Sequence, residues 1–152
     1  MKKIYIASDH GGFYLKEEIK KELLKGDYDI EDLGNTTFDE ADDYPDFSFL
    51  LAEKVSQNNG SFGIVLGRSG NGEAICANKV KGIRAVLCTS EEMAKKAREK
   101  NNANVLALGS DFTEEQESLK IVDTFLNTNF SNEERHVRRI NKISEYESSQ
   151  TK

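Results

Sequence analysis

The stretch Phe62-Gly63-Ile64-Val65-Leu66-Gly67-Arg68-Ser69-Gly70-Asn71-Gly72-Glu73 decides the fold of this chain. Residues 62–66 form a short apolar run, which is typical of a strand buried on both faces of a parallel sheet. The glycines that follow, in the order G-x-x-G-x-G, let the backbone turn tightly and direct amides toward a negative group. A helix expected from Glu73 would add the positive potential of its N-terminus. The stretch therefore predicts a strand, an anion-binding loop and a helix in succession.

The alternation of strand and helix continues over the rest of the chain. Strands are expected at 3–7, 30–33, 62–66, 83–88 and 105–108, and helices at 13–24, 47–55, 73–80 and 91–100, the last opened by Ser90. Two further helices should follow the capping-box patterns Thr113-Glu114-Glu115-Gln116 and Ser131-Asn132-Glu133-Glu134. These segments predict an α/β fold with a five-stranded parallel sheet covered by helices on both faces. One domain should span residues 1–144 with a C-terminal helix, and the polar tail 145–152 should fray.

The charge and hydropathy of the chain limit the kinds of partner it can bind. The 152 residues carry a net charge of −6, and an acidic chain repels nucleic acid and anionic lipid. No apolar run approaches the roughly 20 residues that a membrane span needs. The N-terminus reaches Asp9 and His10 too early for a secretory signal. We therefore expect a cytoplasmic protein that binds neither nucleic acid nor membranes.

The cysteines and histidines give no sign of a metal centre. Cys76 and Cys88 lie in apolar segments without CxxC spacing, as small core residues do in the reducing cytosol. His10 and His136 are the only histidines, and no zinc-type cluster is present. We expect no metal and no cofactor.

Three segments have residue types suited to chemistry. The first is Ser8-Asp9-His10-Gly11-Gly12, after the first strand, where a carboxylate and an imidazole can hold hydroxyls and move a proton. Asp9 could instead cap the next helix, with His10 as an exposed turn residue, and both interpretations stay open.

The second segment is the loop 67–73, which matches neither the dinucleotide pattern nor a nucleotide P-loop. In this loop Glu73 could simply complement the helix dipole.

The third segment is Arg135-His136-Val137-Arg138-Arg139, near the C-terminus. On a helix Arg135 and Arg139 share a face, and two guanidinium groups on one face can clamp a phosphate. The alternative is a solvated basic face paired with acidic neighbours.

Taken together, these motifs resemble the type B ribose-5-phosphate isomerase family, which also includes galactose-6-phosphate isomerase subunits. The matching segments are 8–12, Asp43-Tyr44-Pro45-Asp46, 67–73 with Ala77-Asn78-Lys79-Val80, Gly82-Ile83-Arg84-Ala85, Asn101-Asn102-Ala103-Asn104-Val105, and Arg135-His136 with Arg139. The resemblance implies a Rossmann-like three-layer α/β/α sandwich and interconversion of ribose 5-phosphate and ribulose 5-phosphate. It also implies a homodimer with active sites shared between subunits and no cofactor. Sequence does not distinguish a dimer from a tetramer.

The resemblance also assigns roles. Members of the family use either a Cys just after the third strand or a Glu at the start of the following helix as the base. Gly67 occupies the Cys position here, so Glu73 becomes the base in place of a helix cap. Ser69 and the amides of Gly70, Asn71 and Gly72 resemble the family's anion hole. Substrate contacts are implied for Asp9, His10, Tyr44, Asn101, Arg135 and Arg139.

Three positions depart from the family pattern. Lys100 replaces a His that is assigned to opening the sugar ring, and a lysine is poorly matched to acid–base work near neutral pH. Asp111 replaces an Arg that helps to bind phosphate. Arg68 replaces a common Gly, and we expect it either to supply the missing charge or to pair with Asp111. The alternatives are a six-carbon or unphosphorylated aldose as substrate, or a non-catalytic sugar-phosphate-binding module.

Overall fold

The computed structural model describes residues 1–150 of the chain. Five parallel strands form one sheet in the order β2-β1-β3-β5-β4. The strands are β1 (Lys2–Ser8), β2 (Tyr28–Asp32), β3 (Phe62–Gly67), β4 (Ala85–Leu87) and β5 (Val105–Gly109). The helices are α1 (Phe13–Leu23), α2 (Tyr44–Gln57), α3 (Asn71–Ala77), α4 (Glu91–Asn101), α5 (Glu115–Asn127) and α6 (Glu134–Ser149). The predicted five-stranded parallel α/β fold is confirmed.

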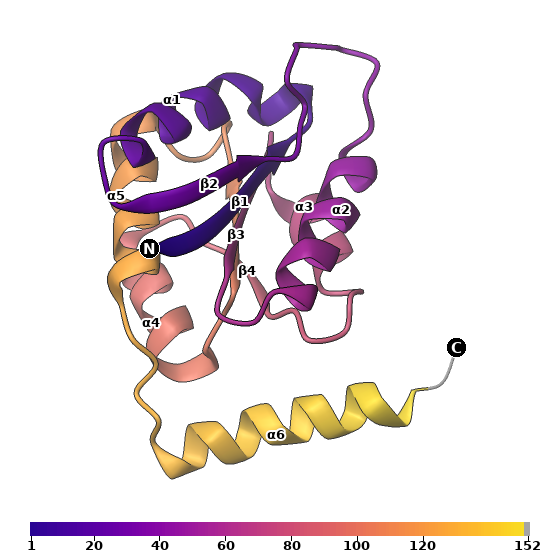
Figure 1. Ribbon diagram of the computed structural model, residues 1–152, viewed down its shortest axis with the longest axis vertical. Helices are drawn as coiled ribbons and strands as arrows, with labels where there is room; N and C mark the ends of the chain where they lie inside the picture. Colours follow the sequence, from indigo (N-terminus) through magenta and orange to yellow (C-terminus); the bar gives the residue numbers. More distant parts are fainter. Residues whose placement is uncertain (151–152) are drawn as a thin grey trace.

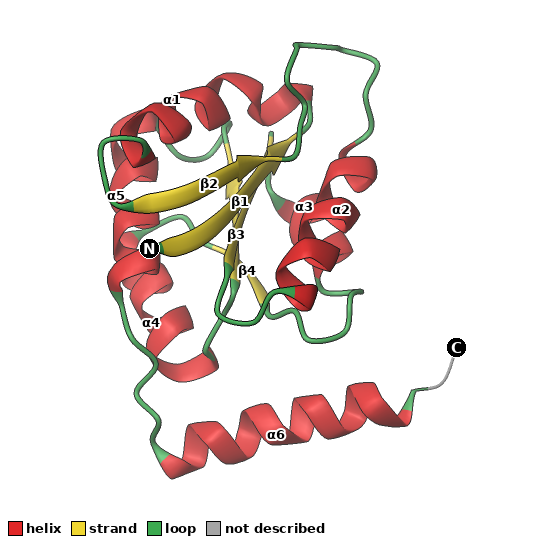
Figure 2. Ribbon diagram, in the orientation of Figure 1, coloured by secondary structure: helices red, strands yellow, loops and turns green. Residues whose placement is uncertain are grey.

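Helices cover the two faces of the sheet unequally (Figures 1 and 2). Helices α1, α4 and α5 pack on one face, and α2 and α3 pack on the other. Side chains of a strand alternate between the faces, so Ile4 and Ile6 of β1 face the first core, whereas Tyr5 and Ala7 face the second. Both sets are buried, which explains why the central strands β1, β3 and β5 contain nearly continuous apolar runs. Cys76 and Cys88 are free and buried, as predicted.

Helix α6 lies apart from these layers, along one end of the molecule (Figure 1). The connection just before it is joined to α4 through the amide of Ser131, which donates to the carbonyl of Glu99 at 3.1 Å. Glu147 near its other end accepts from the amide of Gly82 at 3.2 Å. The helix continues to Ser149, so most of the tail that was expected to fray is helical, and residues 151 and 152 lie outside the described part.

Some predicted boundaries are wrong. Neither capping box forms: α5 starts after Glu114 and α6 after Glu133, and neither cap side chain accepts a bond from a backbone amide of its helix. Ser131 accepts instead from the nearby amide of Glu133 at 3.4 Å, so its hydroxyl is used in a local turn. The cap predicted at Ser90 is correct, because Ser90 accepts from the amide of Met93 at 3.2 Å. Among the described helices, none has the length and apolar character needed to cross a bilayer.

Candidate active site

A pocket of about 280 Å³ opens at the carboxyl edge of the sheet. It lies between the loops after β1 and β3, the neighbouring strands where the chain order reverses, and such a switch point is the usual ligand site of an open α/β sheet. The pocket is lined by seven residues from these two loops and the starts of α2 and α3: Asp9, His10, Tyr44, Arg68, Ser69, Gly72 and Glu73. All seven are among the residues that the sequence singled out.

Glu73 is a buried carboxyl group in this pocket. It lies in the first turn of α3 with 4% of its surface exposed. Burial raises the pKa of Glu73 above its ordinary value, and the negative charge of Asp9 adds to the increase. A carboxyl group whose pKa is moved toward neutrality is suited to accept and return a proton.

The loop between β3 and α3 is held in place by its own turn and by the loop after β5. Gly70 has a φ of +81°, a conformation that a residue with a Cβ rarely adopts. The amides of Ser110 and Asp111 donate to the carbonyls of Gly67 and Arg68, each at 2.9 Å. The two loops therefore form one wall of the pocket.

Within this loop, Ser69 has a defined partner. Its hydroxyl accepts from the amide of Asn71 at 3.1 Å, so this amide is already used inside the loop. The amides of Gly70 and Gly72 remain the closer counterparts of the anion hole that was predicted. Tyr44, at the start of α2, packs its ring against Gly72, where a Cβ would come within 2.4 Å of the ring.

Asp9 and His10 form the opposite wall. Asp9 is 8% exposed and accepts from the amide of Gly11 at 2.9 Å; burial raises its pKa. His10 Nδ1 lies 2.7 Å from Oδ1 of Asp42, and this hydrogen bond raises the pKa of the imidazole. Asp9 thus caps the short turn His10–Gly12 rather than the following helix itself, and it also lines the pocket. Its contact with sugar hydroxyls stays a prediction.

Arg68 and Asp111 meet at the rim. Nη1 of Arg68 lies 3.9 Å from Oδ1 of Asp111, and both side chains are more than half exposed. A pair that is so open to water contributes little stability, so Arg68 can leave Asp111 for an anionic ligand at small cost. The pairing that the sequence offered as one of two roles for Arg68 is confirmed.

Six predicted site residues do not line this pocket. Gly70 and Asn71 belong to the loop 67–73 beside it, whereas the other four lie elsewhere in the chain. Lys100 and Asn101 end α4 just before β5 begins, which places them at the amino edge of the sheet, whereas Glu73 lies at the carboxyl edge. Arg135 and Arg139 lie on α6, which is tied to the same amino edge through Glu99. Arg135 bonds to its neighbour Glu133. A site that contains all the predicted residues therefore requires a second chain.

Asp42 contacts the pocket residue His10, and the sequence reasoning missed it. It precedes the Asp43-Tyr44-Pro45 motif, and an acidic residue beside that motif was the one signal present. Asp9, His10 and Asp42 have potential metal-ligating atoms within 4.8 Å of one another, the one such group in residues 1–150. Because Oδ1 of Asp42 already takes both the ring and the backbone amide of His10, the arrangement indicates a hydrogen-bonded ion pair rather than a metal site.

The open parallel sheet places a buried carboxyl group with a raised pKa near Arg68 and His10 at its carboxyl edge, an arrangement typical of an enzyme site for a small molecule. Residues 4–143 match the Ribose/Galactose Isomerase family, and the chain belongs to that family.

The relatives agree in sequence and in structure. The probable ribose-5-phosphate isomerase B of Mycoplasma genitalium is 49% identical over 145 residues, 95% of each chain. The ribose-5-phosphate isomerase B of Mycobacterium tuberculosis is 43% identical, over 95% of this chain and 90% of that protein. The crystal structure of the Mycoplasma genitalium enzyme with bound ribulose-5-phosphate has a TM-score of 0.94, covering 97% of both chains at 48% identity. The predicted family is therefore confirmed.

Proposed function

We propose that this chain interconverts ribose 5-phosphate and ribulose 5-phosphate, with Glu73 as the base. The observation that carries the proposal is the buried carboxyl group of Glu73, whose pKa is raised by burial, in a pocket with His10 and Arg68. The bound ribulose-5-phosphate in the Mycoplasma genitalium structure supports this choice of substrate. The protein works in the cytoplasm, where the free thiols of Cys76 and Cys88 stay reduced.

In the proposed reaction Glu73 takes the proton from C2 of the open-chain aldose. The C–H electron pair forms the C1–C2 double bond of a cis-enediolate, and the C1 carbonyl oxygen takes up the negative charge. The hydroxyl proton on O2 passes to O1, and Glu73 returns its own proton to C1 as the C2 carbonyl forms. The amides of Gly70 and Gly72, with the hydroxyl of Ser69, stabilise the enediolate oxygens, whereas the amide of Asn71 donates to Ser69 and holds the loop. No electrons leave the sugar, so the step needs no cofactor.

The remaining contacts complete the proposed site. Asp9 holds sugar hydroxyls, and Tyr44 flanks the sugar. His10 and Arg68 attract the phosphate from this chain, joined by Arg135 and Arg139 of a second chain. Lys100 and Asn101 of that second chain approach the ring oxygen and hydroxyls.

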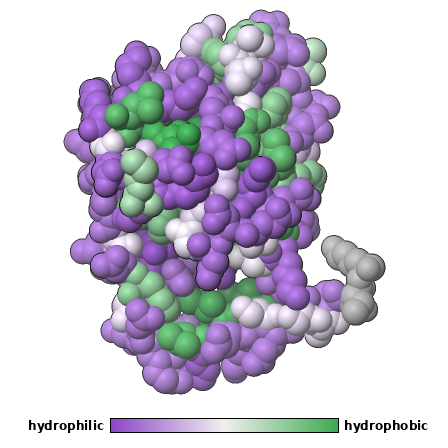
Figure 3. Space-filling model, in the orientation of Figure 1, coloured by the Kyte–Doolittle hydropathy of each residue, from purple (hydrophilic) through white to green (hydrophobic). Residues whose placement is uncertain are grey.

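We also propose a homodimer with shared sites, and the same geometry supports it. Lys100, Asn101, Arg135 and Arg139 lie away from the pocket of their own chain. Helix α6 extends beyond the sheet, and its side chains Ile143 and Tyr146 are 49% and 68% exposed. Figure 3 shows hydrophobic surface gathered where α6 faces the rest of the molecule. Burial of such surface against a second copy would be favourable.

One observation favours a second substrate. Asp111 adds a negative charge at the pocket rim, 3.9 Å from Arg68, and a carboxylate there opposes a phosphate dianion. A six-carbon or unphosphorylated aldose is therefore the alternative substrate. A panel of ribose 5-phosphate, allose 6-phosphate and free ribose separates these cases by comparing kcat/KM.

We expect ribose 5-phosphate to be the best substrate in this panel. The variant Glu73→Gln, assayed with the same sugars, tests the role of Glu73. We expect it to lower kcat about 10³-fold with the fold retained. Wild-type enzyme in deuterated water should place deuterium at the carbon that receives the proton. Undiminished turnover in Glu73→Gln would refute the base assignment. Sugar-phosphate binding without exchange would indicate a non-catalytic binding module.

A further inference from the structure

His10 is held by an acidic side chain from another part of the chain. Oδ1 of Asp42 accepts both from the His10 ring, at 2.7 Å, and from the His10 backbone amide, at 3.0 Å. Oδ2 of Asp42 accepts from the side-chain amide of Asn35 at 2.8 Å. The Asp42 side chain is 7% exposed, so little water competes with these bonds. Both oxygens of Asp42 are thus committed to fixing its position.

Asn35 is itself anchored to the sheet. Its amide donates to the carbonyl of Ser8 at 2.8 Å, and the amide of Ser8 donates to the carbonyl of Gly34 at 2.7 Å. The segment at residues 34–35 therefore extends the pairing of β1 beyond the end of β2. Because Ser8 immediately precedes Asp9 and His10, the same bonds fix both sides of the contact between His10 and Asp42.

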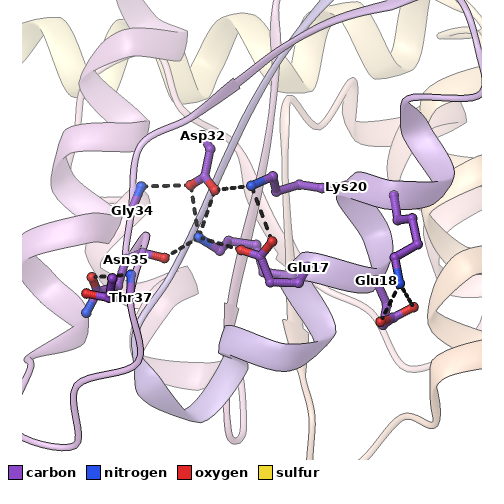
Figure 4. Close-up of polar contacts among 9 residues, drawn as sticks. Glu17, Glu18, Lys20, Asp32, Gly34, Asn35 and Thr37 are labelled. Carbon is purple, nitrogen blue, oxygen red and sulfur yellow. Dashed lines mark hydrogen bonds and ion pairs between the residues drawn. The ribbon is translucent and has the colours of Figure 1, made fainter.

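The buried ion pair between Lys16 and Asp32 helps to hold residues 34–35 in place. Nζ of Lys16, which is fully buried, donates to the carbonyl of Asn35 and to Oδ1 of Asp32 at 2.9 Å. Figure 4 shows Asp32 also bonded to Lys20 and to the amide of Gly34. Burial acts to raise the pKa of Asp32, but these hydrogen bonds outweigh it, so the pKa lies below its ordinary value.

We propose that Asp42 is a positioning residue, which acts through His10 by holding the imidazole with Nδ1 protonated and Nε2 facing the pocket. The hydrogen bond made by one ring nitrogen decides what the other presents, so Nδ1–H···Asp42 leaves Nε2 for the substrate. The role of His10 toward a sugar phosphate rests on the proposed function, whereas the state of the His10 ring does not.

The charges around His10 agree with this role. The bond to Asp42 is the main cause that raises the pKa of His10, the charge of Asp9 acts in the same direction, and Arg68 acts against it. Burial acts to raise the pKa of Asp42, but its hydrogen bonds with His10 and Asn35 and the charge of His10 together outweigh burial and lower it. His10 consequently keeps its positive charge to higher pH than a free imidazole, and a cation is the form that attracts a phosphate.

Nitrogen NMR of the two imidazoles tests the proposal directly. His136 serves as the internal reference, since its partner is Glu133, at 3.1 Å. In Asp42→Asn the midpoint of the His10 titration should fall, and His136 should not change. Glu40→Gln removes the same charge two residues away and should change neither imidazole. Asp42→Ala repeats the test with a side chain that cannot reach the ring.

Kinetics supply the second readout. At about neutral pH the KM for ribose 5-phosphate should rise roughly three- to tenfold in Asp42→Asn, with a smaller change in kcat. The rise of KM with pH should begin at lower pH than in the wild type. An unchanged His10 titration in the Asp42 variants overturns the proposal. Wild-type enzyme that fails to isomerise ribose 5-phosphate overturns the proposed function alone, because the titration still decides the role of Asp42.

Discussion

The carboxyl group of Glu73 occupies the space in which a side chain at Gly67 would begin. A Cβ added to Gly67 would lie 1.8 Å from Oε1 of Glu73 and 2.4 Å from its carboxyl carbon. Two atoms cannot approach so closely, so a base at position 67 and a Glu in this orientation at position 73 exclude each other. The alternative Cys and Glu arrangements of the family therefore have a steric basis in this chain.

This contact predicts the effect of Gly67→Ala. The added methyl group meets the end of a flexible side chain, so Glu73 can rotate away and the fold should survive. Moving a base by about 1 Å costs on the order of 10²-fold in rate. We expect kcat to fall by about that factor while the melting temperature changes by only a few degrees. Wild-type kcat in Gly67→Ala would show that Glu73 is not held where the base must be.

The raised pKa of Glu73 makes a second prediction, for stability against pH. Burial favours the neutral form of Glu73 in the folded protein, whereas the unfolded chain ionises at the ordinary pKa. Glu73 therefore costs no stability at low pH, and the cost grows as pH rises through the interval between the two pKa values. Glu73→Gln should raise the melting temperature by a few degrees, about 1 kcal/mol, at neutral pH. The difference should vanish in acid, and a gain that is equal at all pH values would contradict this account.

Arg68 and Asp111 should have opposite effects on substrate affinity. Arg68→Ala removes a cation from the pocket rim, and we expect the KM for ribose 5-phosphate to rise roughly three- to tenfold. Asp111→Asn removes the carboxylate that competes for Arg68, so its KM should fall. Free ribose supplies the control because it carries no phosphate, and its KM should be nearly unchanged in both variants. Equal KM values for ribose 5-phosphate in Arg68→Ala and wild type would exclude Arg68 from phosphate binding.

The buried Lys16 should matter more for folding than its neighbour Lys20. Both bond to Asp32, but Lys16 is fully buried and also holds the carbonyl of Asn35, whereas the side chain of Lys20 is 25% exposed. Lys16→Met should lower the free energy of unfolding by about 3 kcal/mol, because it leaves Asp32 partly uncompensated. Lys20→Met should cost less than about 1 kcal/mol. Urea unfolding of both variants measures the difference, and equal losses would contradict the anchoring role of Lys16.

The central strands were predictable because a strand that is buried on both faces of the sheet is a continuous apolar run in the sequence. Ile4 and Ile6 alternate with Tyr5 and Ala7 toward two different cores, yet all are apolar, so the run is visible in the sequence. The helix starts after Thr113 and Ser131 were not predictable. Several polar residues in succession can each serve as a cap, and packing decides which one does.

The pocket could be assembled from the sequence because each of its main residues directly follows a parallel strand. Asp9 and His10 follow β1, and Glu73 lies close behind β3. Asp42 was missed because it comes from a long connection whose path no local pattern specifies. Its position depends on Asn35 and on the bonds of Asn35 to Ser8, which are tertiary contacts.

The separation of Glu73 from Arg135 and Arg139 gives the last prediction. If the two arginines act in the site of a partner chain, Glu73→Gln and the double variant Arg135→Ala/Arg139→Ala should complement each other. Each mixed dimer would have one site with both defects and one site with none. Random pairing of equal amounts makes half of the dimers mixed, so about a quarter of all sites should be intact. We therefore expect the mixture, after dissociation and reassociation, to regain about a quarter of wild-type activity, although each variant alone is nearly inactive.

Activity no greater than the average of the two separate variants would place the arginines outside a shared site. Sedimentation of the same mixture would show whether dimers had re-formed.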